Sequence, residues 1–252
     1  MRLPDDATVV IAAKDEEATV AGIVEACRPY AREVLVVVHL HNRDRTADVA
    51  REAGARIVVD RGRGKGDAIR TAIDEIHTPL AIFVDADGSH ATADIPRLVQ
   101  PILSDEADHV SASRLTGGSS ELHGGFDEFF RLAGSSLITA CINWRFGVRL
   151  SDSQNGFRAI RTDALRALHL TSNSTTIEQE MIMKSLGMGY RVCEVPSHEH
   201  QRVAGKSHIN VRRAACRYVA NLVRHMAFVR YPAAPRVAPA TAPTEDRLPA
   251  HN

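Results

Sequence analysis

The sequence feature that most constrains the fold is a regular alternation of strand-like and helix-like segments across residues 8–112. The strand-like segments are apolar throughout, which is typical of strands that are buried on both faces. Such an alternation predicts right-handed crossovers and therefore an α/β fold, a mostly parallel sheet with helices on both faces. The periodicity predicts strands at 8–13, 34–38, 56–59, 80–85 and 109–112, and helices at 18–27, 46–53, 65–76 and 94–103.

The alternation stops after residue 113. A stretch rich in Gly and Ser predicts a loop at 114–125, and the last part, 232–252, is rich in Pro and Ala and is expected to be disordered. The segment 209–231 has one apolar and one basic face, which predicts a C-terminal amphipathic helix. Between them we expect a helix at 126–144, a turn and strand at 151–160, a helix at 177–186, a strand at 191–195 and a polar loop at 196–208.

Charge and composition limit the classes of partner and compartment. Lys plus Arg and Asp plus Glu each number 31, so the balance predicts no nucleic-acid partner. The sequence shows no signal-peptide pattern, and no apolar run approaches the ~18 residues that a transmembrane helix needs. We therefore expect a cytoplasmic protein without a signal peptide or a transmembrane helix.

Two carboxylates follow the strand expected at 80–85. Asp85 and Asp87 are separated by one residue. Asp15 and Glu16, which are adjacent, come shortly after the first expected strand. Ligands of open α/β sheets bind beyond the carboxyl ends of the strands, so these acids are expected at one site. Mg²⁺ and Mn²⁺ prefer such oxygen ligands, with phosphates completing the coordination. The alternative is that the two aspartates only end a strand and start a turn.

A second candidate lies in the segment 62–66, which reads Gly-Arg-Gly-Lys-Gly. It lacks the spacing of a P-loop and does not follow the first strand as a dinucleotide-binding turn would. Lys65 stands at a helix start, where a cation and free backbone N–H groups can meet a phosphate. Helix entry and ligand contact both remain open for this segment.

Five segments in order carry a resemblance to a known family. They are Val-Ile-Ala-Ala-Lys-Asp-Glu-Glu at 10–17, Gly-Lys-Gly at 64–66, Asp-Ala-Asp at 85–87, Asp-Ser-Gln-Asn-Gly-Phe-Arg at 152–158, and Arg202 with Gly-Lys-Ser at 205–207. This order resembles family 2 glycosyltransferases, and most of all the dolichol-phosphate mannosyltransferases and related polyprenyl-phosphate sugar transferases. The resemblance covers nearly everything from residue 8 to about residue 213.

The resemblance implies a GT-A (Rossmann-like) fold and inverting transfer from a nucleotide diphosphate sugar, GDP-mannose or a UDP-sugar, with Mg or Mn as cofactor. It implies one domain over 1–231, with 1–113 binding the donor, 114–208 the acceptor, and 209–231 as the C-terminal helix. The acceptor expected is a polyprenyl phosphate. A soluble acceptor, or a nucleotide-sugar-binding protein without turnover, remain as alternatives.

The resemblance also implies roles for individual residues. The nucleotide contacts expected are Ala13, Asp15, Glu16, His39, Lys65, Asp85 and Ala86. The metal ligands expected are Asp85, Asp87 and Ser89. The catalytic residues expected are Asp87, Asp152 as a base or acceptor-orienting group, and Arg202. The residues expected to hold the acceptor phosphate are Arg114, Arg131, Lys206 and Ser207.

Three departures from the family pattern qualify these roles. His39 and Leu40 stand where the family commonly has acids near the nucleoside, Ser89 stands where a Gln can complete the metal ligands, and His208 replaces a Lys. The C-terminal region is unusual in another way, because no acid lies between Glu199 and Glu245. A basic helix of this kind predicts peripheral contact with an anionic membrane, with a solvated docking helix as the alternative.

Overall fold

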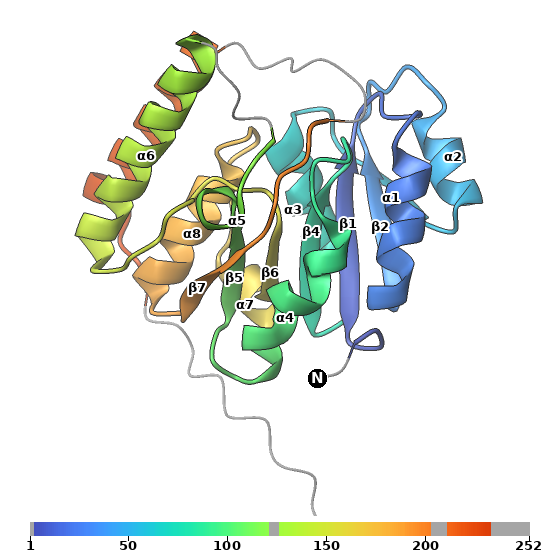
Figure 1. Cartoon of the computed structure of the whole chain (residues 1–252), viewed down its shortest axis with the longest axis horizontal. Coiled ribbons are helices and arrows are strands. Elements are labelled where there is room, and N and C mark those ends of the chain that lie inside the picture. Colours follow the sequence, from blue (N-terminus) through green and yellow to red (C-terminus); the bar gives the residue numbers. More distant parts are fainter. Residues whose placement is uncertain (1–2, 121–125, 203–210, 233–252) are drawn as a thin grey trace, which may run out of the picture.

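The computed structural model describes residues 3–120, 126–202 and 211–232, without the side chains of 126–131 and 211–214. Its centre is a seven-stranded sheet (Figure 1). The strands are β1 (Ala7–Ala13), β2 (Glu33–Val38), β3 (Arg56–Val59), β4 (Leu80–Asp85), β5 (His109–Ser113), β6 (Arg158–Arg161) and β7 (Val192–Pro196). Their order across the sheet is β3-β2-β1-β4-β6-β5-β7.

One strand runs against the others. The pairs β1–β2, β1–β4, β2–β3 and β5–β7 are parallel, whereas β6 pairs antiparallel with both β4 and β5. The carboxyl ends of the six parallel strands therefore share one edge of the sheet with the amino end of β6. Residues that follow β1, β2 and β4, and residues that precede β6, meet at this carboxyl edge.

Helices cover both faces of the sheet (Figure 1). α1, α2 and α4 pack on one face, and α3, α7 and α8 pack on the other. The bounds are α1 (Val20–Cys27), η1 (Arg28–Tyr30), α2 (Thr46–Glu52), α3 (Lys65–Glu75), η2 (Thr92–Asp94), α4 (Ile95–Leu103), α5 (Arg114–Gly117), α6 (Phe126–Phe146), α7 (Thr162–Ala167), α8 (Ile177–Met188), α9 (Val211–Val223) and η3 (Arg224–Phe228).

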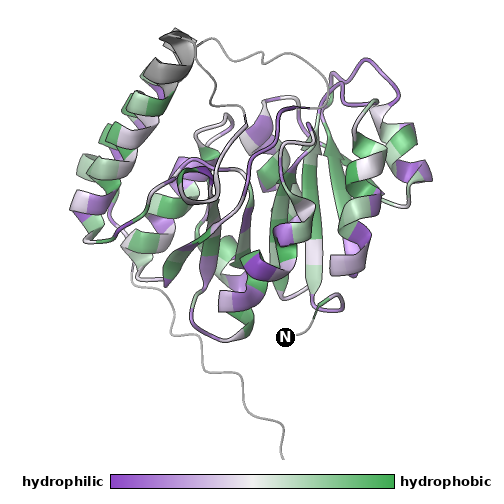
Figure 2. Ribbon diagram, in the orientation of Figure 1, coloured by the Kyte–Doolittle hydropathy of each residue, from purple (hydrophilic) through white to green (hydrophobic). Residues whose placement is uncertain are grey.

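Two hydrophobic cores result from the alternation of side chains along each strand. Val9 and Ile11 of β1 point into the core under α1, while Val10 points into the core under α3. Figure 2 shows the central strands β1, β2 and β4 mostly in the colours of hydrophobic residues, in keeping with burial on both faces. The apolar runs in the sequence are apolar because each strand residue faces one core or the other.

A third hydrophobic cluster joins α6, α8 and α9 at the side of the sheet (Figure 1). Ile142 and Ile182 are fully buried in it, and Leu222 and Met226 of the C-terminal segment pack against them. Across the described residues, no helix has both the length and the apolar character to cross a membrane.

The expected mostly parallel sheet with helices on both faces is confirmed, and so are the positions of the first five strands. The loop expected at 114–125 was wrong at its start, because the Ser113 hydroxyl caps the backbone N–H of Thr116 and α5 forms. The strand expected within 151–160 is confined to β6. The backbone N–H groups of Ser151 and Asp152 donate to the Glu194 carboxylate and not to the backbone of a neighbouring strand.

Two further differences concern helices. α7 was not predicted from the sequence, and the C-terminal helix expected at 209–231 ends earlier than expected, at Phe228. Its last described turn is a π-helix, η3, after which Val229 is extended. The tail at 233–252, for which we expect disorder, lies outside the described residues, and the single domain over 1–231 stays a prediction.

Candidate active site

Asp85 ends β4 at the carboxyl edge of the sheet and is bound by a lysine. The Lys65 ammonium, at the first turn of α3, lies 2.6 Å from Asp85 Oδ1 and 2.8 Å from Glu178 Oε1. Burial lowers the pKa of Lys65, but the two carboxylates outweigh burial and raise the pKa above its usual value. For Asp85 the opposite holds: burial raises its pKa, and Lys65 with His90 brings the pKa well below the usual range. Both groups are therefore charged near neutral pH.

Asp87, in the turn after β4, is bound by the backbone N–H and the hydroxyl of Ser89 and by the Arg202 guanidinium. Asp87 Oδ1 accepts hydrogen bonds from the backbone N–H of Ser89 at 3.0 Å and from its hydroxyl at 2.7 Å. Asp87 Oδ2 lies 3.3 Å from Arg202 Nε. Between the two aspartates, the carbonyl of Ala86 accepts a hydrogen bond of 2.6 Å from the Thr19 hydroxyl of the loop before α1. The turn is thus tied to the first strand–helix connection.

The segment before β6 packs directly on Asp85. A Cβ atom added to Gly156 would stand 2.8 Å from Asp85 Oδ2 and 3.1 Å from Lys65 Nζ, so any larger residue here would require the Asp85 side chain to shift. His90 stacks on Phe157 with ring centroids 5.1 Å apart. Its Nδ1 accepts a hydrogen bond from the Asp85 backbone N–H. The structure therefore brings the Asp-Ala-Asp turn and the Asn-Gly-Phe segment into contact.

The loops after β1 and β2 hold each other. Asp15 has a left-handed backbone, with φ of 56°, and its N–H and carboxylate bond to Asn42 Oδ1 and to the Arg43 N–H, each at 2.7 Å. The Glu16 N–H donates to the Thr46 hydroxyl at 2.8 Å. Ala13 ends β1, and its carbonyl accepts a hydrogen bond of 3.0 Å from the His39 N–H. These contacts place Ala13, Asp15 and Glu16 at one edge.

The Glu16 carboxyl has a raised pKa, unlike that of Asp85. Burial raises the pKa of its carboxyl to about 7, against a hydrogen bond from Thr19 that lowers the pKa, and the negative charge of Asp87 adds to the rise. Glu16 and Asp87 are therefore close enough to interact electrostatically. The first strand–helix loop and the Asp-Ala-Asp turn form one site.

His39 and Leu40 form part of an ordered wall after β2. His39 Nδ1 accepts a hydrogen bond from the His41 N–H, and the Leu40 N–H donates to Asp60 Oδ1 at 2.9 Å. The same oxygen of the buried Asp60 accepts from the Gly62 N–H. The carboxylate that organises this wall thus comes from the end of β3, and Leu40 itself is exposed.

Asp152 and Arg114 form a second ion pair at this edge. Arg114 donates to both oxygens of Asp152, from Nε at 2.6 Å and from Nη2 at 3.0 Å, and the Asp152 side chain is only 2% exposed. Arg114 Nη1 also lies 3.3 Å from Glu199 Oε1. Glu199 is bridged through its backbone to His90, which lies beside Asp85. Arg114 therefore stands between two carboxylates, next to the Asp85 region.

The sequence matches the model of the family described as glycosyl transferase family 2 over residues 8–168, which is more than half of the chain. The chain belongs to this family. Its matched region contains every acid of the site described above except Glu178 and Glu199. The family 2 resemblance noted in the sequence is thereby confirmed.

Curated relatives share this family and most of the chain. Glycosyltransferase AglJ of Haloferax volcanii is 27% identical over 206 residues, which cover 81% of this chain and 66% of AglJ. Dolichyl-phosphate hexose transferase of the same organism is 26% identical over 207 residues, 82% of this chain and 87% of that protein. The chain thus spans about two thirds of the length of the first relative and most of the second.

A solved structure confirms the fold. Glucosyl-3-phosphoglycerate synthase from Mycobacterium tuberculosis, in a crystal structure with Mg²⁺ and uridine diphosphate, superposes with a TM-score of 0.70 at 18% identity. The likeness covers 87% of this chain and 79% of that chain. The expected GT-A fold is therefore present in this family 2 glycosyltransferase.

The structure brings most of the expected site residues together. Asp85, Asp87 and Ser89 share one turn, and Arg202 and Lys65 each pair with one of its aspartates. The expected acceptor-phosphate residues are placed only in part. Lys206 and Ser207 lie outside the described residues, as does the side chain of Arg131.

Three contributors to the site were not assigned from the sequence. Glu178 holds Lys65, Glu199 holds Arg114, and His90 lies beside Asp85. Glu178 and Glu199 come from segments without a recognisable motif, so only the fold reveals their positions, whereas His90 directly follows the Asp-Ala-Asp turn. A weak signal was available for Glu178, because an acid two residues into an otherwise buried helix is uncommon unless it has a partner.

The oxygen atoms of the turn after β4 suit a hard divalent cation that also binds phosphate. Among the described residues no group of three or more His, Cys, Asp or Glu side chains is placed to hold a metal alone. Asp85 and Asp87, with the Ser89 hydroxyl, instead offer oxygen ligands from one turn. Magnesium is usually held by one or two carboxylates together with substrate phosphates, so these residues fit Mg²⁺ or Mn²⁺ bound with a nucleotide diphosphate.

Proposed function

We propose that this protein transfers a sugar, with inversion, from a nucleotide diphosphate sugar to a polyprenyl phosphate, with the help of Mg²⁺ or Mn²⁺. The observation that carries the proposal is the Asp85–Asp87 turn at the carboxyl edge, with Lys65 and Arg202 paired to its two acids. The Mg²⁺ and uridine diphosphate of the mycobacterial synthase support the donor and the metal. The name of the dolichyl-phosphate hexose transferase supports the acceptor.

The donor would occupy the edge formed by the loops after β1, β2 and β4. Asp87 and Asp85, with Ser89, would hold the cation, which when bound stabilises the negative charge of the departing diphosphate. Lys65 orients Asp85, and Ala13, Asp15, Glu16, His39 and Ala86 would line the nucleoside and sugar. The GDP or UDP identity of the donor is part of this proposal.

Arg202 is proposed to neutralise charge at the reacting centre. Its Nε lies 3.3 Å from Asp87, which places a guanidinium next to the carboxylate expected to hold the cation. A fixed positive group at that position stabilises charge that develops on the leaving diphosphate. Arg202 would therefore act on the transition state more than on donor binding.

The acceptor would lie between Asp152, Arg114 and the following segment. A phosphate acceptor is already ionised at neutral pH and needs positioning rather than a general base. Arg114 occupies both oxygens of Asp152, which favours an orienting role for Asp152 over a base. Arg114, with the expected Arg131, Lys206 and Ser207, would supply the charge-assisted hydrogen bonds that a phosphate prefers.

An assay with radiolabelled sugar donors tests the proposal. The protein is incubated with UDP- and GDP-sugars, with Mn²⁺ or with EDTA, and with either a polyprenyl phosphate or soluble acceptors. The proposal expects a lipid-linked product that depends on the divalent cation. Products only with soluble acceptors would support the first alternative, and donor binding without any transfer or hydrolysis would support a binding protein. Full activity in EDTA would exclude the proposed metal role.

A peripheral membrane position is proposed on a separate observation. Five exposed large apolar side chains lie on α6, α9 and η3, among them Trp144 at 81% and Phe228 at 77% exposed. Arg217 of α9 and Arg224 of η3 are exposed as well. Helices that expose both apolar and basic side chains suit an anionic membrane, where a polyprenyl acceptor would be found.

Vesicle flotation tests the membrane proposal. The wild-type protein should float with vesicles containing phosphatidylserine at low salt and much less with neutral vesicles. Arg217→Gln combined with Arg224→Gln should weaken flotation, because each basic residue near the surface contributes ~1 kcal/mol. No binding to anionic vesicles at low salt would leave these arginines as solvated groups of a docking helix.

A further inference from the structure

Glu178 is buried and shares the Lys65 ammonium with Asp85. It is the second residue of α8, and its side chain is 4% exposed. Its Oε1 lies 2.8 Å from the Lys65 ammonium, which on its other side lies 2.6 Å from Asp85. Lys65 is therefore shared by two carboxylates that come from distant parts of the sequence.

The stability of the fold does not explain this carboxylate. Glu178 Oε2 is buried and has no hydrogen-bond partner among the described residues. A buried carboxylate with an unsatisfied oxygen costs free energy, and buried ion pairs are often no more stabilising than apolar residues of similar size.

The charge balance of the trio indicates what Glu178 contributes. Lys65 and Asp85 alone would form a neutral pair, in which the ammonium competes with any other cation for Asp85. Glu178 adds a second negative charge, so the trio carries a net single negative charge. Because the Lys65 ammonium is shared with Glu178, it neutralises the Asp85 carboxylate only in part, and Asp85 can still attract a ligand cation.

The surroundings hold Glu178 and Lys65 in place. The backbone carbonyl of Glu178 accepts a hydrogen bond of 3.0 Å from Arg158 Nη1, and Arg158 is fully buried at the start of β6. Gly156 closes on the Asp85–Lys65 pair without room for a Cβ. The ammonium therefore has little freedom to leave its position between the two carboxylates.

We propose that Glu178 is a positioning residue for Asp85, which acts through Lys65 to keep Asp85 oriented and available to the cation of a metal–nucleotide diphosphate. This inference rests on the proposed function. It predicts that the loss of the Glu178 charge lets Lys65 neutralise Asp85 fully. The binding of the metal–nucleotide complex should then weaken, while the chemical step is changed less.

Calorimetric titration with UDP and GDP in the presence of Mn²⁺ tests the inference directly. Glu178→Gln keeps the size of the side chain and should weaken nucleotide binding about 10-fold, the effect of one partly screened charge. In transfer assays the same variant should raise the donor KM by a similar factor and change kcat by less than about 3-fold. Thermal melting and circular dichroism would check that the variant is folded.

A double variant separates positioning from a merely structural role. Lys65→Met removes the group through which Glu178 is proposed to act, so adding Glu178→Gln to Lys65→Met should change nucleotide affinity by less than about 3-fold. The matched control is Asp108→Asn, which neutralises a buried carboxylate paired with Arg191 at the opposite edge of the sheet. The control should bind nucleotide as the wild type does.

The outcomes distinguish the inference from the function on which it rests. If the wild type binds neither Mn²⁺–UDP nor Mn²⁺–GDP, the proposed function is overturned and the inference with it. If the wild type binds and Glu178→Gln binds equally well, the inference alone is overturned. The inference also fails if Glu178→Gln weakens binding as much in the Lys65→Met protein as in the wild type, because Glu178 would then not act through Lys65.

Discussion

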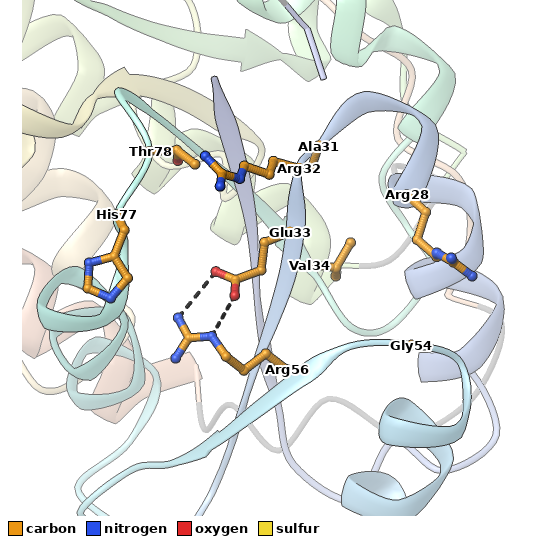
Figure 3. Close-up of a pocket in the computed structure, with 9 residues that line it drawn as sticks. All are labelled: Arg28, Ala31, Arg32, Glu33, Val34, Gly54, Arg56, His77 and Thr78. Atoms are coloured by element: carbon orange, nitrogen blue, oxygen red, sulfur yellow. Dashed lines mark hydrogen bonds and ion pairs between the residues drawn. The ribbon is translucent and has the colours of Figure 1, made fainter. Parts of the chain in front are cut away.

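Each edge of the sheet carries a cation that lies between two carboxylates. At the amino edge Arg56 lies 2.6 Å from Glu33 and 2.7 Å from Glu75, in a cleft of about 560 Å³ (Figure 3). At the carboxyl edge Lys65 lies at nearly the same distances from Asp85 and Glu178. Charge pattern and distance alone therefore do not distinguish a structural cluster from a functional one.

The two clusters differ in how completely their polar atoms are hydrogen-bonded and in how deeply their side chains are buried. Arg56 uses its planar fork, donating to both oxygens of Glu33, to Glu75 Oε2 and to the Glu75 carbonyl, and all three side chains are partly exposed. Lys65 is a point charge, and one of its partners, Glu178, is buried with an unpaired oxygen. The carboxylates of the amino-edge cluster are bound by Arg56, whereas the carboxyl-edge cluster leaves Glu178 Oε2 without a hydrogen-bond partner among the described residues.

The largest expected effect is on turnover at the carboxyl edge. Asp87→Ala should lower turnover at least ~100-fold, or ~2.7 kcal/mol, because it removes a carboxylate proposed to hold the cation. Steady-state transfer assays with Mn²⁺ and a nucleotide sugar measure this loss, and circular dichroism monitors the fold. Near-normal turnover of a folded Asp87→Ala protein would contradict the assignment of this turn.

The second prediction concerns stability at the same edge. Asp152→Asn should lower the free energy of unfolding by about 2 kcal/mol, because Arg114 keeps its charge and loses the better of its buried partners. Urea denaturation measures the change. Ser151→Ala is a useful reference, since it neighbours Asp152 and leaves the ion pair intact. A loss no greater than that of Ser151→Ala would show that the pair is screened like a surface one.

The third prediction uses the pH dependence of Glu16. Its pKa is about 7 in the folded protein and 4.5 in the reference state, so the folded form binds more protons between these values. The contribution of Glu16 to stability is therefore full below pH 4.5 and is lost as the pH rises through 7. With discounting for solvent screening, Glu16→Gln should gain roughly 1 kcal/mol over wild type at pH 8 relative to pH 5.

Chemical denaturation at a series of pH values checks this third prediction. Glu17→Gln serves as the control, because it removes the neighbouring carboxylate of the same loop. Parallel pH profiles for wild type and Glu16→Gln would contradict the raised pKa.

The smallest effect is expected at the amino edge. Glu33→Gln should reduce stability by less than ~1 kcal/mol, since the pair with Arg56 is partly exposed and Glu75 remains as a partner. Turnover and nucleotide affinity should stay at the wild-type level, as measured alongside Asp87→Ala. A marked loss of activity would show that the two edges communicate, and would weaken the contrast between them.

Much of the fold could be predicted because its signals are local. Runs such as 34–38 are apolar throughout, which predicts strands buried on both faces, and the acids after the first and fourth strands mark the ligand edge. The donor-side residues Asp85, Asp87 and Glu16 follow from that reasoning. Each of them lies within a few residues of the strand end that positions it.

What could not be predicted depends on contacts between distant segments. Glu178 and Glu199 gain their roles only because α8 and the chain after β7 are brought to Lys65 and Arg114. The direction of β6 also has no local signal, since a four-residue strand reads the same in either orientation. Sequence periodicity predicts elements, but it does not predict which buried charges will meet.

The position of β6 also has a consequence for the order in which the protein can form during synthesis. Within the part of the chain that the structure describes, β5 pairs only with β6 and β7, both of which follow it in the chain. The strands β1 to β4 can pair as soon as they leave the ribosome, but β5 has no neighbour in the sheet until β6 inserts beside β4. Contacts between distant residues form slowly because loop closure costs entropy. The nascent chain must therefore carry an unpaired β5 until the segment bearing Asp152 and Gly156 has been made.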